Sequence, residues 1–270
     1  MQESMLLLGK ERIHVTSHYS GQSTTLIFVH GNSLSSQYWK PQFDSDLAQH
    51  FNLLALDLQG HGQSEPAADP ASSYSFSAYG QVLLSLLEQQ KVVSFVLIGH
   101  SLGGHVVLEL LPFLNELTCR GVVTIGTPPL QKPWDQGQPF LPNPHAAILF
   151  QAEAPEEALE ALSLSMIRPG GEAWSLVPKT YRQTDSLART TFIQNTLTGQ
   201  YQDEVALIRS SFVPVLLTYG EEEQIVNPAY FGTLQLADEL CTIVGIPQAG
   251  HLASYENAAF FNALLKEHFA

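Results

Sequence analysis

The chain has 270 residues, of which 44% are hydrophobic and 14% are charged, and this balance excludes a disordered protein. Its formal net charge of −14 argues against nucleic acid or an anionic membrane as a partner. Residues 1–10 lack the basic start and the long apolar run of a secretion signal, and no apolar run approaches the length of a membrane span. We therefore expect a globular, cytoplasmic protein.

Metal and redox chemistry are not predicted. Cys119 and Cys241 stand beside strand-like runs at no metal-ligand spacing, so we expect buried thiols rather than a disulfide framework. The ten histidines contain no H-x-H-x-D-H pattern of a metal site. We therefore predict no metal and no other cofactor.

Apolar runs of strand length recur along the chain with helical stretches between them. An alternating run at residues 13–15 predicts an antiparallel edge strand near the start. Residues 81–90 and 258–269 place apolar side chains on one face of a helix. This rhythm predicts an α/β fold with a mainly parallel sheet and helices on both faces. Buried strands are predicted at residues 26–29, 53–56, 95–98, 122–125, 215–219 and 241–244.

The rhythm is interrupted between residues 131 and 209. This stretch begins rich in proline and then shows helical spacing at residues 155–166, 185–196 and 203–209, without strand-like runs. Helices inserted between two sheet strands are expected to cover the carboxyl edge of the sheet, where ligands bind in open α/β sheets. We therefore predict a core domain formed by residues 1–130 and 210–270, with residues 131–209 as a helical cap, or lid.

A G-x-S-x-G sequence stands at Gly99, Ser101 and Gly103, between the predicted strand at 95–98 and a predicted helix at 103–111. In this strand–turn–helix context the motif predicts a serine nucleophile on a sharp turn. The flanking glycines keep side chains away from the turn, and the helix amides help to stabilise the negative charge that the attack creates.

A serine nucleophile needs a base, and the base needs an acid that orients it. His251 follows the last predicted strand and is the candidate base. The acid is expected in the turn after the strand at 215–219, where three glutamates stand in a row. We predict Glu223, which lies three residues beyond Gly220, and keep Glu222 as the alternative.

Two backbone N–H groups are expected to form an oxyanion hole. One is the N–H of Leu102 at the helix start, and the other is the N–H of Asn32 in the loop after the first buried strand. The neighbouring histidines are expected to pack or to hydrogen-bond the backbone: His30, His61, His100 and His105. Aromatic candidates for an acyl pocket are Tyr38, Trp39, Trp134, Phe140, Phe150 and Trp174.

Together these motifs resemble the α/β-hydrolase superfamily over nearly the whole chain. The matching segments are 30–32, 57–64, the Ser101 turn, 220–223 and 250–251. Segments 30–33, 99–105 and 125–129, with a glutamate rather than an aspartate as the acid, resemble the N-acyl-homoserine lactonases of this superfamily. That resemblance implies an α/β-hydrolase fold with a cap and a metal-independent opening of a lactone ring by a Ser-Glu-His triad.

The function predicted is hydrolysis of a carboxylic ester or lactone through an acyl-enzyme, with a small molecule as substrate and a monomer or homodimer as the assembly. Haloalkane dehalogenation is rejected because it needs a carboxylate where Ser101 stands. Two alternatives stay open. A hydrolase of carbon–carbon bonds would use basic cap residues, namely Arg168, Lys179, Arg182 and Arg189. A small-molecule receptor of the same fold would hold an ester-like ligand without cleaving it.

Overall fold

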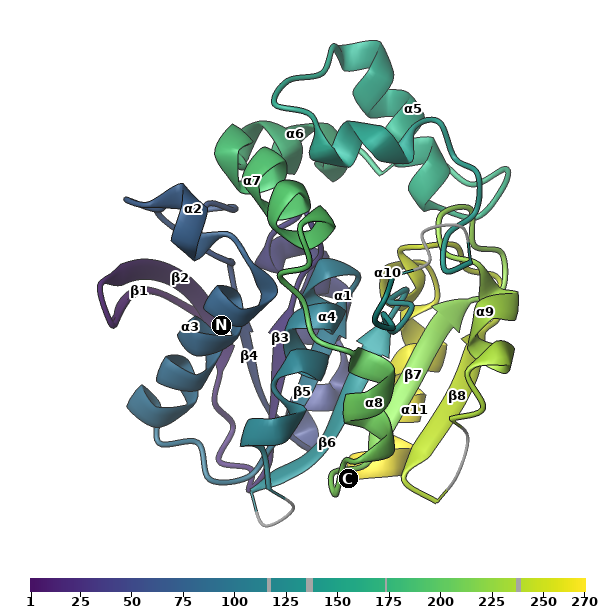
Figure 1. Cartoon of the computed structure of the whole chain (residues 1–270). Coiled ribbons are helices and arrows are strands. Elements are labelled where there is room, and N and C mark those ends of the chain that lie inside the picture. The colour runs from purple at the N-terminus through teal and green to yellow at the C-terminus, as the bar shows by residue number, and fades with distance from the viewer. Residues whose placement is uncertain (116–117, 135–137, 173, 237–238) are drawn as a thin grey trace.

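The computed structural model describes residues 1–115, 118–134, 138–172, 174–236 and 239–270. Within these residues the centre is an eight-stranded sheet with the order β1-β2-β4-β3-β5-β6-β7-β8 (Figure 1). The strands are β1 (Gln2–Leu8), β2 (Glu11–His18), β3 (Thr25–Val29), β4 (Asn52–Leu56), β5 (Phe95–His100), β6 (Cys119–Ile125), β7 (Val215–Gly220) and β8 (Cys241–Ile246).

Strands β3 to β8 pair in parallel, whereas β2 is antiparallel to both β1 and β4. The six predicted strands and the mainly parallel sheet are confirmed, but β8 at the edge of the sheet is only partly buried. The predicted strand at 13–15 is antiparallel, but it is not the edge of the sheet, because β1 pairs with its outer side. Strand β1 was not predicted: it is mostly exposed, although its sequence ends in the apolar run Met5–Leu8.

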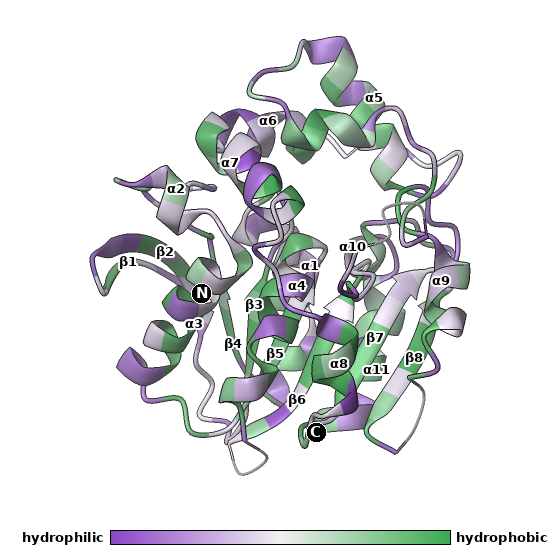
Figure 2. Ribbon diagram, in the orientation of Figure 1, coloured by the Kyte–Doolittle hydropathy of each residue, from purple (hydrophilic) through white to green (hydrophobic). Residues whose placement is uncertain are grey.

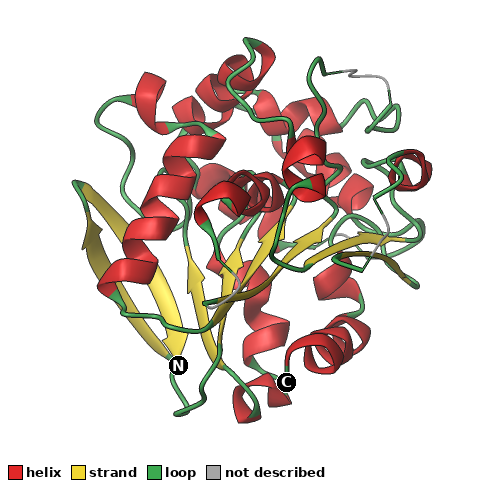
Figure 3. Cartoon of the chain, turned by 60° about the horizontal axis from the view of Figure 1, so that its bottom comes forward, coloured by secondary structure: helices red, strands yellow, loops and turns green. Residues whose placement is uncertain are grey.

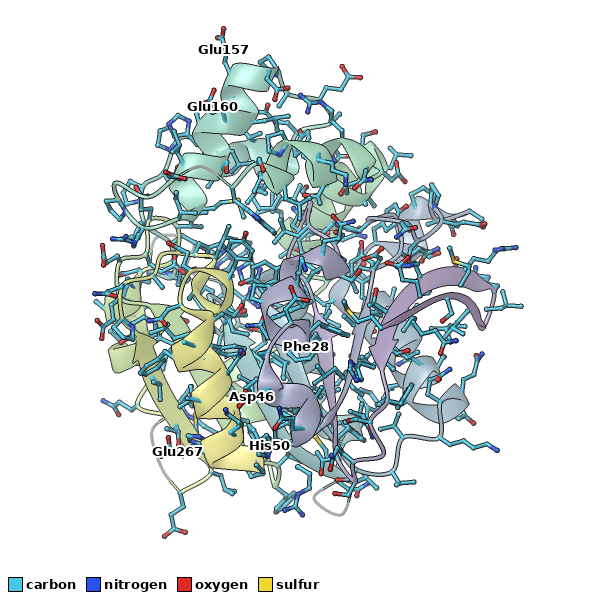
Figure 4. All side chains as sticks on the ribbon, turned by 180° about the vertical axis from the view of Figure 1, so that it is seen from behind. Phe28, Asp46, His50, Glu157, Glu160 and Glu267 are labelled. Carbon is cyan, nitrogen blue, oxygen red and sulfur yellow. The ribbon has the colours of Figure 1, made fainter. Side chains whose placement is uncertain are left out.

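Helices cover both faces of the sheet (Figure 3). Helices α3 (Phe76–Gln89) and α4 (Leu102–Glu109) pack on one face, while α1 (Lys40–Phe43) and α11 (Ala258–Phe269) lie on the other (Figures 1 and 4). Helix α3 starts where the Ser75 side chain accepts a hydrogen bond from the Ala78 N–H, which is a standard N-cap. The predicted helices at 81–90, 103–111 and 258–269 therefore exist, although α3 begins one turn earlier than predicted.

The chain between β6 and β7, which we call the β6–β7 segment (residues 126–214), contains helices and no strand among its described residues. It carries η4 (Ala146–Phe150), α5 (Glu156–Met166), α6 (Leu176–Gln183), α7 (Ser186–Leu197) and α8 (Glu204–Arg209). Helices α5, α6 and α7 lie beyond the carboxyl ends of the parallel strands (Figure 1), and Glu157 and Glu160 point outward from α5 (Figure 4).

Helix α6 is the helix of this segment that the sequence analysis missed, because it is polar and contains Pro178. The proline stands in the first turn, where a helix tolerates a residue without an N–H. The remaining short elements are η1 (Ser36–Trp39), η2 (Asp46–Gln49), α2 (Pro70–Ser73), η3 (Leu111–Phe113), α9 (Pro228–Thr233) and α10 (Ala253–Glu256).

The core lies on both sides of the central strands, which are the most apolar part of the chain (Figure 2). Phe28 of β3 is fully buried (Figure 4), and its ring lies 5.0 Å from Trp39 and 6.0 Å from Phe43. Cys119 and Cys241 are both buried, as predicted, and neither forms a disulfide bond within the described residues. Among those residues, no helix is at once long and apolar enough to cross a bilayer.

Candidate active site

Ser101 occupies a strained turn between β5 and α4. Its φ of 51° and ψ of −117° lie in a region that residues other than glycine rarely adopt. The Ser101 N–H donates to the Ile125 carbonyl at 2.8 Å, which ties the turn to β6. A Cβ atom on Gly99 would lie 2.2 Å from the Gly103 carbonyl oxygen, and one on Gly103 would lie 2.3 Å from the Val29 carbonyl oxygen. The two glycines are therefore required by the close approach of three backbone segments.

His251 and Glu223 form a buried pair. His251 Nδ1 lies 2.9 Å from Glu223 Oε1, and both side chains are almost completely shielded from solvent. Glu223 Oε2 accepts from the backbone N–H groups of Ile225 and Val226 at 3.3 and 3.2 Å. A carboxylate only accepts hydrogen bonds, so Nδ1 carries the proton and Nε2 of the neutral ring is left as a proton acceptor.

Of the two glutamates that the sequence left open, Glu223 is the one that contacts His251. Glu222 is half-buried, and its backbone N–H donates to the Ala249 carbonyl at 2.9 Å. Gly126 lies against the pair: its φ is +56°, and an added Cβ would sit 2.9 Å from His251 Nδ1. The turn after β6 therefore leaves room for the imidazole only because it carries glycine.

Ser101 and His251 line one cavity of about 340 Å³. Ser101 also lines an adjoining cavity of about 80 Å³, together with Asn32 and Leu102. Among the described residues no lysine or arginine contributes to the larger cavity. Most of its wall is apolar: Pro128, Trp134, Phe140, Leu141, Ala146, Ala147, Leu149, Phe150, Ile193, Leu197 and Ile225.

Asn32 and Leu102, the residues predicted to supply the oxyanion-hole amides, line the smaller cavity together with Ser101. Leu102 is the first residue of α4, so its N–H has no acceptor inside the helix. In the described part of the chain, neither N–H has a backbone acceptor. The Asn32 side chain is engaged elsewhere, because its Nδ2 donates to the Leu149 carbonyl at 2.8 Å. The two amides thus remain available to a ligand atom at Ser101.

Of the six aromatic candidates for an acyl pocket, Trp134, Phe140 and Phe150 line the larger cavity. The other three lie elsewhere. Tyr38 and Trp39 belong to η1 and are fully buried in the core. Trp174 packs on Tyr255 with a ring-centroid distance of 4.6 Å and does not line the larger cavity. Aromatic character alone did not separate pocket from core, because both environments are apolar.

Several wall residues were missed by the sequence analysis. Ile193 and Leu197 stand four residues apart on α7 and both line the larger cavity. Their spacing is the signal that could have found them, because residues i and i+4 share one face of a helix. Leu149 and Ile225 carry no such signal, since their place in the wall depends on how the β6–β7 segment folds back over β7.

Hydrogen bonds to backbone N–H groups also hold the loop that carries His251. Glu256 accepts from the Gly250 N–H and from the Arg168 N–H, each at 2.8 Å. The Leu252 N–H donates to the carbonyl of Met166, the last residue of α5, at 3.0 Å. The loop is therefore also bonded to the end of α5. No sequence pattern indicates this role for Glu256, because it resembles any other acidic residue of a short helix.

The histidines expected to bond the backbone do so in three cases. His30 Nε2 accepts from the Leu58 N–H at 2.9 Å, so its Nδ1 carries the proton and donates to the Gly31 carbonyl at 2.7 Å. His61 Nδ1 lies 3.1 Å from the Gln59 carbonyl oxygen, and His100 Nε2 lies 2.9 Å from that of His251. His105 differs, because its partner is a side chain, Glu204.

The buried imidazole of His61 predicts a loss of stability in mild acid. Burial, reinforced by nearby His30, lowers the pKa of His61 to about 3 from 6.5 in an exposed imidazole. Below pH 6.5 the unfolded chain therefore binds a proton at this site that the folded protein does not, so stability falls as the pH falls. Between pH 5.5 and 4.5 such a group lowers the free energy of unfolding by about 1.4 kcal/mol.

The substitution His61→Phe removes this titrating group while keeping an aromatic ring beside Tyr79. We expect the plot of unfolding free energy against pH to become shallower by about 1.4 kcal/mol per pH unit over that window, as measured by urea denaturation. Parallel plots for the two proteins would mean that His61 does not stay neutral in the folded state.

The comparisons with known proteins can now be set beside this geometry. The model of the family described as "Alpha/beta hydrolase family" matches residues 26–264, and the chain belongs to this family. The predicted α/β-hydrolase fold is thereby confirmed.

Among solved structures, a mutant of the N-acyl homoserine lactonase AidH in complex with N-hexanoyl homoserine lactone superimposes with a TM-score of 0.89 and 26% identity, covering 99% of this chain and 97% of that chain. A pimeloyl-[acyl-carrier protein] methyl ester esterase of Nitrosospira multiformis is 24% identical over 91% of this chain and 93% of its own length. The dihydrolipoyllysine-residue acetyltransferase component of an acetoin cleaving system of Cupriavidus necator is 25% identical over 92% of this chain, which spans only 64% of that protein. The chain is thus similar to a lactonase, to an esterase and to an acetyltransferase component.

Proposed function

We propose that this protein is a serine hydrolase of carboxylic esters or lactones, with Ser101 as nucleophile, His251 as base and Glu223 as the acid that orients it. The observation that carries the proposal is the buried hydrogen bond of 2.9 Å between His251 and Glu223, beside a cavity that Ser101 also lines. The strained backbone at Ser101 supports it, because such strain is retained mainly at functional sites.

In the proposed reaction Ser101 Oγ attacks the carbonyl carbon while its proton passes to His251 Nε2. The N–H groups of Asn32 and Leu102 stabilise the oxyanion. The tetrahedral intermediate then collapses, the carbon–oxygen bond to the leaving alcohol breaks, and Nε2 returns the proton to that alcohol. Water next attacks the acyl-enzyme, gives its proton to Nε2, and the acid is released as Ser101 recovers its own proton.

The substrate proposed is an N-acyl homoserine lactone. Similarity to AidH over almost the whole chain supports this choice, since that enzyme has been crystallised with N-hexanoyl homoserine lactone. The largely apolar wall around Ser101 also suits an acyl chain. We further propose that residues 131–209 act as the cap that covers this cavity, because Phe140, Phe150 and Ile193 of that stretch form part of its wall.

The proposal is tested with p-nitrophenyl esters of increasing chain length beside N-acyl homoserine lactones of matching length, with products identified by mass. Ring opening adds one water and leaves a single N-acyl homoserine, whereas amide cleavage releases homoserine lactone. We expect turnover of the short esters and ring opening of the lactones. Absence of ester turnover would refute the serine-hydrolase proposal, and ester turnover without ring opening would refute the lactone substrate.

The carbon–carbon bond hydrolase is the less favoured alternative. It needs a basic group for a substrate carboxylate, and none of the four cap residues considered for this role lines the cavity. Arg189 is buried and donates to the carbonyls of Gln151 and Tyr181, at 2.8 and 2.9 Å. Arg182 instead pairs with Glu156 on the outside of the β6–β7 segment.

A further inference from the structure

A second buried histidine–carboxylate pair lies one helical turn from Ser101. His105 is on α4, which Ser101 precedes as its N-cap, and the His105 N–H donates to the Ser101 carbonyl at 3.3 Å. Both residues line the two cavities described above. His105 Nδ1 lies 2.9 Å from each carboxylate oxygen of Glu204, whose side chain is fully buried at the start of α8. Because a carboxylate only accepts, the proton of the neutral ring is on Nδ1 and Nε2 is a hydrogen-bond acceptor.

Glu204 explains why the His105 ring is held in one orientation. Its Oε2 also accepts from the Leu130 N–H at 2.7 Å, and the Glu204 N–H donates to the Leu130 carbonyl at 2.8 Å. The carboxylate is therefore fixed where the chain enters and leaves the β6–β7 segment. Phe76 packs on the other side of the His105 ring, with a centroid distance of 5.0 Å.

The His105 ring also forms part of the wall of both cavities at Ser101. Its Nε2 has no hydrogen-bond partner among the residues that the structure describes. The contact with Glu204 uses Nδ1 alone, so a purely structural role leaves Nε2 unexplained. In a wall that is otherwise mostly apolar, this atom can accept a hydrogen bond from a ligand.

Trp134 supplies a complementary group in the same two cavities. Its indole Nε1–H is buried and lacks an acceptor among the described residues. A buried indole N–H normally has a partner, and leaving it without one is costly. The ring is held edge-on between Phe140 and Tyr201, each with a centroid distance of 6.2 Å. An oxygen acceptor on the ligand would satisfy this donor.

We propose that His105 and Trp134 together bind a secondary amide of the substrate: His105 Nε2 accepts the amide N–H, and Trp134 Nε1–H donates to the amide carbonyl. The inference rests on the proposed ester or lactone hydrolysis and names the group that selects its substrate. In an N-acyl homoserine lactone a single carbon separates the amide nitrogen from the lactone carbonyl carbon. This short separation suits a binding group one helical turn away from the nucleophile.

The test compares two lactones of equal length. One is N-hexanoyl homoserine lactone, and the other is α-heptyl γ-butyrolactone, in which methylenes replace the amide. The readout is the ratio of kcat/KM for the amide lactone to kcat/KM for the alkyl lactone. We expect Trp134→Phe and His105→Asn each to lower this ratio by roughly five- to tenfold, the value of one hydrogen bond between neutral groups.

His105→Asn and His105→Gln form a matched pair. The Asn amide nitrogen occupies the place of Nδ1 and can still donate to Glu204, whereas the Gln side chain reaches the place of Nε2 and can still accept from the substrate. We expect the Gln variant to keep most of the ratio even if its melting temperature falls further than that of the Asn variant. A role confined to supporting the fold would instead lower both lactone activities together.

The inference is overturned if the ratio is unchanged in His105→Asn and Trp134→Phe, or if the unmodified protein does not prefer the amide lactone. In either case turnover of p-nitrophenyl esters would leave the proposed serine-hydrolase function standing. A protein that cleaves neither esters nor lactones would overturn that function and this inference with it. The assay thus separates the two failures.

Discussion

Replacing Ser101 with alanine should lower kcat for a short p-nitrophenyl ester by roughly 10⁴–10⁶-fold. In the proposed mechanism the variant removes the oxygen that forms the acyl-enzyme, while the amides of Asn32 and Leu102 and the cavity remain. The loss therefore falls on kcat, and the residual rate reflects binding and the oxyanion hole alone. The measurement is steady-state kinetics, with the fold checked by circular dichroism.

A fluorophosphonate probe provides an independent readout of the same group. We expect the unmodified protein to be labelled at Ser101 and the Ser101→Ala variant to stay unlabelled, with labelled peptides identified by mass. Retained ester turnover in the variant would contradict the assignment of the nucleophile. An unmodified protein that binds lactone but neither reacts with the probe nor turns over ester would instead be a receptor of this fold.

Replacing Glu223 with glutamine should lower kcat by roughly 10³–10⁴-fold with little change in KM. A glutamine amide has one accepting oxygen, whereas both oxygens of the carboxylate accept, so the His251 Nδ1–H is held less firmly. The amide also carries no charge to stabilise the imidazolium that forms during the attack. It also weakens the hold on the turn, because Glu223 Oε2 accepts from Ile225 and Val226. The pH dependence of kcat should shift together with the rate.

Glu222→Gln is the matched control, since it makes the same chemical change one residue away. Glu222 does not hydrogen-bond His251, so we expect this variant to keep a rate close to that of the unmodified protein. A collapse of kcat in Glu222→Gln with a normal rate in Glu223→Gln would show that the wrong acid has been assigned.

Local sequence was enough to predict the elements that carry the proposed nucleophile and base. The apolar run before Gly99 and the helical pattern after Ser101 predict a strand, a turn and a helix, and this is what β5 and α4 form. His251 follows β8 in the same way. In a parallel sheet the carboxyl ends of the strands share one edge, so the order of the elements already brings these loops together.

The remaining decisions depend on contacts between residues far apart in the chain. Three adjacent glutamates are alike in the sequence, and only the packing of the turn after β7 selects Glu223 as the partner of His251. The pocket wall is a similar case, because Trp134 and Trp174 are both tryptophans of the β6–β7 segment, yet only Trp134 lines the larger cavity.

By itself, then, the sequence determined the fold class, the motif at Ser101 and the chain order of serine, acid and histidine, because each depends on short-range periodicity and turn chemistry. Tertiary structure alone decided that β1 forms the edge, that Glu204 orients His105, and that α7 completes the cavity. These outcomes depend on strand register and on how helices pack across the sheet, and no local pattern of side chains encodes either of them.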